Sequence, residues 1–256
     1  MHIIHPQQRT VVLLHSSASS ARQWDRLAEV LKPQFRVRAI EVHGHGEQQA
    51  WRGDARLALA DEVALAVPVL EEAGPVHVVG HSYGAAVAIK LATMYPKSVR
   101  SLAAYEPVLF RFLFDDVAHH PVAQDVVVVA DAMREQLATG NNHSAAQVFI
   151  DFWSGAGAWD SLPDGKQASI AARIHAVFQQ FDALFHEPLQ RARFQVSQRR
   201  GGQLTKFRRS EFVALTRAHH EKPLGRQARG RMHQGHLQHL AGQLAAGGQA
   251  RQNTPG

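Results

Sequence analysis

A serine between two glycines is the residue of this chain best placed to do chemistry. The segment Gly80-His81-Ser82-Tyr83-Gly84 follows the apolar run "VHVV" and is followed at once by the helical pattern "AAVAIKLA". A sharp strand-to-helix turn of this kind exposes the serine as a nucleophile, and the helix amides face any negative charge that develops. The five residues alone are a weak signal, and the alternative is an ordinary serine in a glycine-rich turn. The preceding strand and the following helix favour the nucleophile.

A second loop, "HSSASS" at residues 15–20, follows an earlier apolar run and has the composition of an anion-binding loop. Acyl transfer requires two preorganised N–H donors for the oxyanion. The N–H groups of Tyr83 and Ser17 are expected to be these donors, because small residues let the backbone approach a substrate. The alternative is a plain strand-to-helix loop in which Ser19 or Ser20 caps the helix, and the two interpretations are compatible.

The elements that must position these loops alternate between strand and helix. Apolar, β-branched runs predict strands over residues 9–17, 35–42, 76–80 and 99–110. Helical spacing predicts helices over residues 20–34, 57–74 with a bend at Pro68, and 85–95. In the first helix one face is expected to carry Trp24, Leu27, Val30 and Leu31. The alternation predicts an α/β fold with a mostly parallel sheet and helices on both faces.

Residues 107–187 have a different character. Their amphipathic patterns at 125–140 and 168–185 predict helices with no strand between them, which indicates a helical insertion across the carboxyl edge of the sheet. Three regions are therefore expected: a core over 1–106, a helical lid over 107–187 and an atypical C-terminal segment over 188–256. In open α/β sheets binding gathers at the carboxyl edge, so this lid would cover Ser82.

Composition excludes several classes of protein. The chain has no cysteine, which excludes disulfides and thiolate metal sites, and no run approaches the roughly 18 apolar residues of a membrane span. The start "MHIIHPQQRT" lacks the layout of a secretion signal, so a cytoplasmic protein is expected. The stretch "HGHGE" lacks the spacing of a zinc site, and no glycine motif for phosphates is present. Neither a metal nor another cofactor is expected.

The basic charge of the chain is concentrated in its last quarter. Residues 191–256 hold 13 Lys and Arg against two acidic residues, whereas residues 1–190 hold 15 against 20. This arginine-, glycine- and glutamine-rich composition favours a frameshift product, with a disordered basic tail and a divergent folded half as the alternatives. Arginines interleaved with aromatic residues are missing, which disfavours nucleic acid as a partner.

These features together resemble the α/β-hydrolases, in particular the small, lid-bearing, esterase-like group. Residues 9–110 match that order: a strand, a His-small-small loop, a strand ending in "HGHGEQ", the turn "GHSYG" and the strand "SVRSLAAYEPVLF". Ser16 departs from the pattern, because the family usually has glycine there. The resemblance implies that an acid and then a histidine follow the serine along the chain.

The resemblance leaves the acid and the base to be identified. No aspartate follows Asp182, but Glu106 ends the strand after the serine, where some relatives place their acid. Its alternative is a buried structural glutamate. The base would be a late histidine, and the candidates are His219, His220, His233, His236 and His239. His236 is the chosen candidate because it follows a glycine, whereas His15 and His81 are interpreted as structural.

The resulting prediction is a serine hydrolase that cleaves an ester or related acyl bond of a small apolar substrate. Relatives on this scaffold also hydrolyse C–C bonds or act as cofactor-free haloperoxidases, while Ser82 excludes the aspartate nucleophile of dehalogenases and epoxide hydrolases. The alternatives are a catalytically inactive or truncated hydrolase fold that acts as a binding module, and a binding protein with a basic tail.

Overall fold

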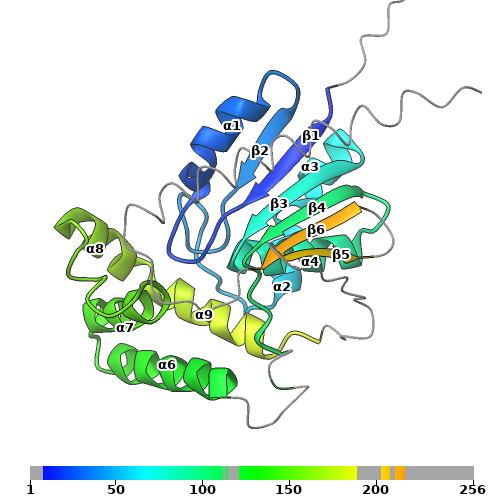
Figure 1. Cartoon of the computed structure of the whole chain (residues 1–256). Coiled ribbons are helices and arrows are strands. Elements are labelled where there is room, and N and C mark those ends of the chain that lie inside the picture. Colours follow the sequence, from blue (N-terminus) through cyan, green and yellow to red (C-terminus); the bar gives the residue numbers. More distant parts are fainter. Residues whose placement is uncertain (1–7, 112–113, 115–120, 189–202, 208–210, 217–256) are drawn as a thin grey trace, which may run out of the picture.

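The computed structural model describes residues 8–111, 114, 121–188, 203–207 and 211–216, and its strands form one sheet (Figure 1). The strand order is β2-β1-β3-β4-β6-β5, and every neighbouring pair is parallel except β5 and β6. The strands are β1 (Thr10–Leu14), β2 (Arg36–Ile40), β3 (Val76–His81), β4 (Val99–Tyr105), β5 (Gln203–Phe207) and β6 (Glu211–Thr216). Strands β1 and β3 are mostly apolar and buried, because they lie inside the sheet rather than at its edges.

Helices cover both faces of this sheet, as the sequence predicts. On one face lie the 3₁₀ turn η1 (Ala21–Trp24) and helix α1 (Asp25–Leu31), whose Trp24 and Leu27 share a buried cluster with Leu13 of β1. The other face is covered by α2 (Leu59–Ala64), α3 (Val67–Ala73) and α4 (Tyr83–Met94). The α/β fold class is confirmed.

Two details of the predicted helices are wrong. Val30 was expected on the buried face but is 53% exposed, because at 3.6 residues per turn it lies about 80° from the centre of the stripe that Leu27 and Leu31 turn toward the sheet. The helix predicted over residues 57–74 is two helices rather than one bent helix. Pro68 lies in the first turn of α3. Backbone N–H groups in a first turn make no hydrogen bond within the helix, so proline is tolerated there.

The fourth strand also ends earlier than predicted. β4 stops at Tyr105 instead of continuing to residue 110, because Glu106 has a φ of 47° and therefore leaves the extended conformation. Pro107 follows directly and cannot donate a ladder hydrogen bond. The turn places Glu106 at the carboxyl end of β4, beside the end of β3.

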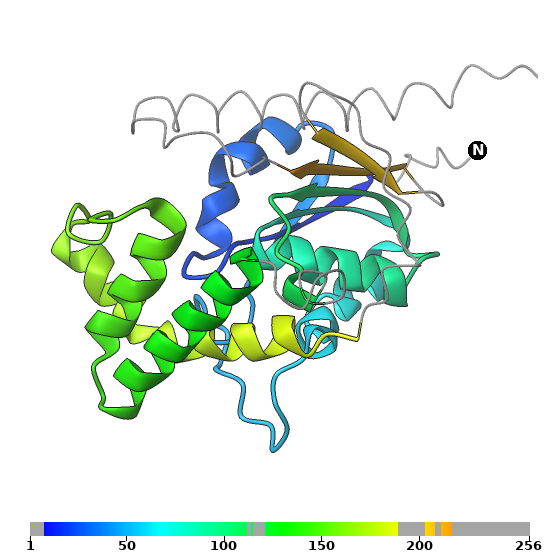
Figure 2. The same ribbon diagram turned by 60° about the horizontal axis from the view of Figure 1, so that its bottom comes forward.

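Residues 121–185 form four helices. They are α6 (Pro121–Ala138), α7 (Asn142–Ser154), α8 (Asp164–Ala172) and α9 (Ile174–Phe185). The single helix predicted over 168–185 is wrong in one detail, because Arg173 (φ −108°, ψ 5°) leaves the helical conformation and divides it into two. Helices α6, α7 and α8 form a group to one side of the sheet, and α9 runs from that group back toward α4 (Figures 1 and 2). The described residues contain no helix that is both long and apolar enough to cross a bilayer.

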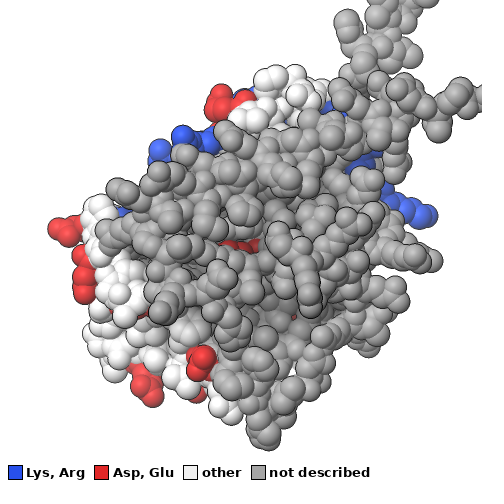
Figure 3. Space-filling model, viewed as in Figure 1, with Lys and Arg blue, Asp and Glu red and all other residues white. Residues whose placement is uncertain are grey.

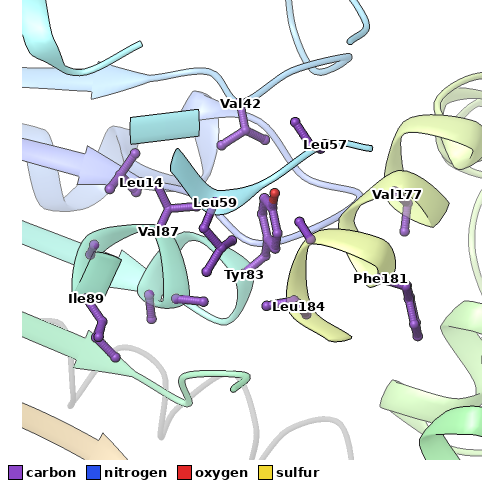
Figure 4. Packing of buried hydrophobic residues seen from close by; sticks show 14 of the residues in the cluster. Leu14, Val42, Leu57, Leu59, Tyr83, Val87, Ile89, Val177, Phe181 and Leu184 are labelled. Carbon is purple, nitrogen blue, oxygen red and sulfur yellow. The ribbon is translucent and has the colours of Figure 1, made fainter. Parts of the chain in front are cut away.

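Helix α9 packs against the core beneath the serine turn. The ring of Tyr83 lies between Leu59 of α2 and Leu184 of α9, while Phe181 points from α9 toward the other helices of this group (Figure 4). A Cβ on Gly44 would lie 2.3 Å from the Cβ of Ala176, so the loop after β2 also touches α9 closely. These contacts hold α9 against the carboxyl edge of the sheet.

Candidate active site

Ser82 lies on a strained turn between β3 and α4. Its φ of 54° and ψ of −117° are rarely adopted by residues other than glycine, and its N–H donates to the carbonyl of Tyr105 at 2.9 Å. The flanking glycines are required by close contacts. A Cβ on Gly80 would lie 2.4 Å from the carbonyl oxygen of Gly84, and a Cβ on Gly84 would lie 2.3 Å from that of Leu14. This geometry is the strand-turn-helix context that the serine motif requires.

The loop at residues 15–20 lies beside this turn. Ser16 donates its N–H at 3.1 Å and its hydroxyl at 2.8 Å to the side-chain oxygen of Gln23. Ala18 has a φ of 58° and donates its N–H to Nε2 of His45 at 3.2 Å. In the described part of the chain, the N–H groups of Ser17 and Tyr83 have no hydrogen-bond acceptor. The two predicted donors are therefore unoccupied and close to the serine turn.

Ser82 opens into a cavity of about 280 Å³ between the sheet edge and the helices. Its apolar wall is formed by Val108, Phe110, Phe149, Ile150, Trp153, Phe181 and Leu184, and its polar wall by Ser16, Ser17, His81, Ser82, Glu106, Ser154 and Gln180. The apolar residues of the wall therefore come mainly from α7 and α9, and the polar residues mainly from the loop at residues 15–20 and from the ends of β3 and β4.

The structure brings Glu106 into this cavity together with His81. Nε2 of His81 lies 4.0 Å from Oε2 of Glu106. Nδ1 of His81 lies 3.1 Å from the side-chain nitrogen of Gln23, which can only donate, so Nδ1 is the acceptor and the neutral ring carries its proton on Nε2, facing Glu106. Gln23 thus connects the loop at residues 15–20 with the serine turn.

The predicted base lies outside the described residues. His236 belongs to residues 217–256, as do His219, His220, His233 and His239. Among the residues that the structure describes, no imidazole is hydrogen-bonded to the hydroxyl of Ser82. Of the described histidines, His81 lines the cavity; it was expected to be structural.

The side chain of Tyr83 points away from the cavity into the core. Its hydroxyl donates to Oε1 of Glu62 at 3.0 Å, and the N–H of His43 donates to Oε2 of the same carboxyl at 3.0 Å. Glu62 is fully buried, and this burial raises the pKa of its carboxyl; burial likewise raises the pKa of the Tyr83 hydroxyl well above 10. Only the backbone of Tyr83 can therefore take part in chemistry at Ser82.

Two glutamines that were not predicted from the sequence help to build this site. Gln23 orients His81, and Gln180 of α9 accepts a hydrogen bond from the hydroxyl of Ser17 at 2.5 Å. Gln180 had a detectable signal, since it is a polar residue on the apolar face formed by Val177, Phe181 and Leu184. Gln23 had none, because its role depends on residues 58 positions away. No cluster of three potential metal ligands occurs among the described residues.

Comparison with known proteins identifies the family of this chain. The model of the Alpha/beta hydrolase family matches residues 11–247, and the chain belongs to this family. An α/β hydrolase from Sphaerobacter thermophilus superimposes with a TM-score of 0.57 at 23% identity, over 73% of this chain and 70% of that one. An enol-lactonase from Burkholderia xenovorans gives 0.53 at 17% identity, over 73% and 68%. At these identities the two structures show the fold.

Curated relatives match a smaller part of the chain. It is 36% identical over 103 residues to lipase LipV of Mycobacterium tuberculosis, covering 39% of this chain and 37% of the lipase. It is also 36% identical over 117 residues to a pimeloyl-[acyl-carrier protein] methyl ester esterase of Chromobacterium violaceum, covering 44% and 42%. The chain thus spans less than half the length of these relatives.

Proposed function

We propose that this protein is a serine hydrolase that cleaves an ester or a related acyl bond. The observation that carries the proposal is the strained turn at Ser82, which lines a partly open cavity of mixed polar and apolar lining at the carboxyl edge of the sheet. The names of the relatives, a lipase and a methyl ester esterase, support an ester as the substrate.

In the proposed reaction, the hydroxyl oxygen of Ser82 attacks the ester carbonyl carbon while a histidine takes its proton. The N–H groups of Tyr83 and Ser17 stabilise the oxyanion, which is worth about 3 kcal/mol for each donor. Collapse of the tetrahedral intermediate releases the alcohol, which receives the proton from the histidine, and water then hydrolyses the acyl-enzyme. His236 is the proposed base and Glu106 the proposed acid.

The proposed substrate is a small molecule with a short, mainly apolar acyl group. The cavity volume and its aromatic wall support this choice. The helices over residues 121–185 would act as the lid that excludes water. These helices carry an excess of acidic residues, with seven Asp and Glu against three Lys and Arg over residues 121–185. Figure 3 shows acidic side chains over the part of the surface where Figure 1 places α6 to α8, which disfavours an anionic polymer there.

Labelling with a fluorophosphonate tests this proposal. The reagent is expected to modify the intact chain at one serine, Ser82, and to leave the Ser82→Ala variant unmodified, as measured by intact mass and peptide mapping. Ser154→Ala is the matched control, because Ser154 lines the same cavity away from the turn, and it should be labelled like the wild type. A chain that stays unmodified under conditions that label a reference esterase would contradict the proposal.

A binding module is the second candidate. This alternative applies if none of the histidines over residues 217–256, which lie outside the described residues, acts as a base for Ser82. Such a module would bind apolar esters in the cavity without turnover. Calorimetric binding of methyl hexanoate to an unlabelled, inactive chain would support the module over the hydrolase.

A further inference from the structure

One buried donor in the cavity has no acceptor among the residues that the structure describes. Gln180 is 1% exposed and lines the cavity, and its side-chain nitrogen Nε2 has no hydrogen-bond partner among the described residues. Its oxygen Oε1 lies 2.5 Å from the hydroxyl oxygen of Ser17. This distance is typical of an O–H···O hydrogen bond and too short for N–H···O, so the oxygen faces Ser17 and the NH₂ group is the unpaired end.

The surroundings of Gln180 make this unpaired donor significant. Its helical neighbours Phe181 and Leu184 are apolar and buried, and both line the same cavity. A purely aliphatic acyl group that filled the cavity would expel water and leave the NH₂ group without any acceptor. A buried polar group in this position selects ligands that pair with it and rejects analogues that do not.

We infer that Gln180 is a specificity-determining residue, whose NH₂ group binds a second, neutral carbonyl oxygen on the acyl chain of the substrate. This inference rests on the proposed hydrolase function. The oxygen of the reacting ester already has two proposed donors, the N–H groups of Ser17 and Tyr83. A carboxylate substituent is disfavoured because Glu106 lies on the wall of the same cavity. The substrates are therefore oxo-acyl esters rather than plain alkanoates.

The Gln180→Glu variant separates this role from the contact with Ser17. Glutamate has the same shape and can still accept the Ser17 hydroxyl, but it replaces the NH₂ donor with an oxygen. The Gln180→Met variant is the matched control that removes both groups. The substrates are methyl hexanoate and its 3-oxo, 4-oxo and 5-oxo derivatives, followed in a pH-stat. The ratio of kcat/KM between wild type and variant on each ester cancels the intrinsic reactivity of that ester.

For at least one oxo ester, Gln180→Glu is expected to lower kcat/KM by about tenfold to a hundredfold, and by less than about threefold for methyl hexanoate. An equal loss on all four esters would overturn the inference, because it would indicate a role at the reacting carbonyl. The inference also fails if Gln180→Met lowers kcat/KM equally on every ester while Gln180→Glu behaves like wild type. In that case Gln180 serves only to hold the hydroxyl of Ser17.

A binding experiment keeps this inference separate from the proposed function. In the Ser82→Ala background, which cannot turn over, calorimetry compares methyl hexanoate with the three oxo esters. At least one oxo ester should bind about tenfold more tightly, and Gln180→Glu in the same background should remove this difference. Equal or absent binding overturns the inference. Suppose that an oxo ester binds more tightly than methyl hexanoate but that fluorophosphonate does not label Ser82. The Gln180 site would then be supported, and the hydrolase function would be rejected.

Discussion

At the scale of single residues, one buried imidazole supports the loop at residues 15–20. His45 is 1% exposed, accepts the N–H of Ala18 through Nε2 and donates from Nδ1 to the carbonyl of His43 at 2.9 Å. The pKa of His45 is lowered to about 4. Burial is the main cause and the nearby His15 and Arg173 add to it, while the hydrogen bond to the His43 carbonyl and the charge of Glu41 oppose it. The imidazole is therefore neutral near pH 7, as its acceptor role requires.

The stability of the fold should consequently depend on pH through His45. Between pH 6.5 and about 4, the unfolded chain binds a proton at this residue that the folded chain does not bind. The contribution of neutral His45 to the unfolding free energy is fully present above pH 6.5 and is lost as the pH falls toward 4. In wild type, His45 should add up to about 1.4 kcal/mol per pH unit to the slope of the unfolding free energy in this range, and the His45→Asn variant should lose this part of the slope.

Urea denaturation at several pH values between 4.5 and 7.5 measures this effect. His77 has a pKa lowered to about 4 by burial, so it contributes in the same range and the variant keeps that part of the slope. His186→Asn, at an exposed position, controls for the loss of a histidine as such. Parallel profiles for wild type and His45→Asn would show that the interpretation of His45 is wrong.

At the scale of elements, the approach of α4 to β1 positions the serine turn. A Cβ on Gly84 would lie 2.3 Å from the carbonyl oxygen of Leu14 and 2.4 Å from that of His15. Both atoms belong to the backbone of the central sheet and its following loop, so no side-chain rotation relieves the overlap. The first turn of α4 can therefore pack against β1 only with glycine at this position.

The Gly84→Ala variant is expected to lose about 2 kcal/mol or more of unfolding free energy, since α4 must shift away from β1. Gly165→Ala in α8 is the matched control, because nothing lies within 4 Å of its Cβ position. The control should be neutral or gain up to about 1 kcal/mol from helix propensity. Equal urea midpoints for the two variants would contradict the close approach.

At the scale of the whole molecule, the C-terminal segment completes one side of the sheet. β6 pairs with β4 in parallel, with Ser101–Tyr105 opposite Glu211–Leu215, so β4 is not the edge strand. The family match also continues through residue 247. The frameshift origin expected for residues 188–256 stays a prediction, and translation of the other reading frames downstream of codon 188 tests it.

Removal of residues 191–256 should expose the backbone of β4 as a new edge. We expect a loss of about 2 kcal/mol or more of unfolding free energy and self-association through the unpaired strand. The measurements are urea denaturation and sedimentation. A chain that ends at residue 216, and so keeps β5 and β6, is the control and should resemble the full chain. If the shorter chain is equally stable and monomeric, the pairing of β4 with β6 contributes nothing.

The sequence by itself determined the alternating strands and helices, the serine turn and the helical character of residues 121–185. These features depend on local spacing, such as the glycines two residues on either side of Ser82, and spacing is visible without a structure. Small local errors arose where backbone geometry decided the outcome, as at Arg173 and at the end of β4.

Only the tertiary structure decided which side chains meet at Ser82. Ser17 and Gln180 are 163 positions apart, and Gln23 and His81 are 58 apart, yet each pair is hydrogen-bonded in the site. Glu106 was predicted from the sequence, but its position beside His81 depends on how β4 and β3 pair. Contacts of this kind follow from the packing of α9 and the loops on the sheet edge, because burial of apolar faces, rather than local spacing, brings distant segments together.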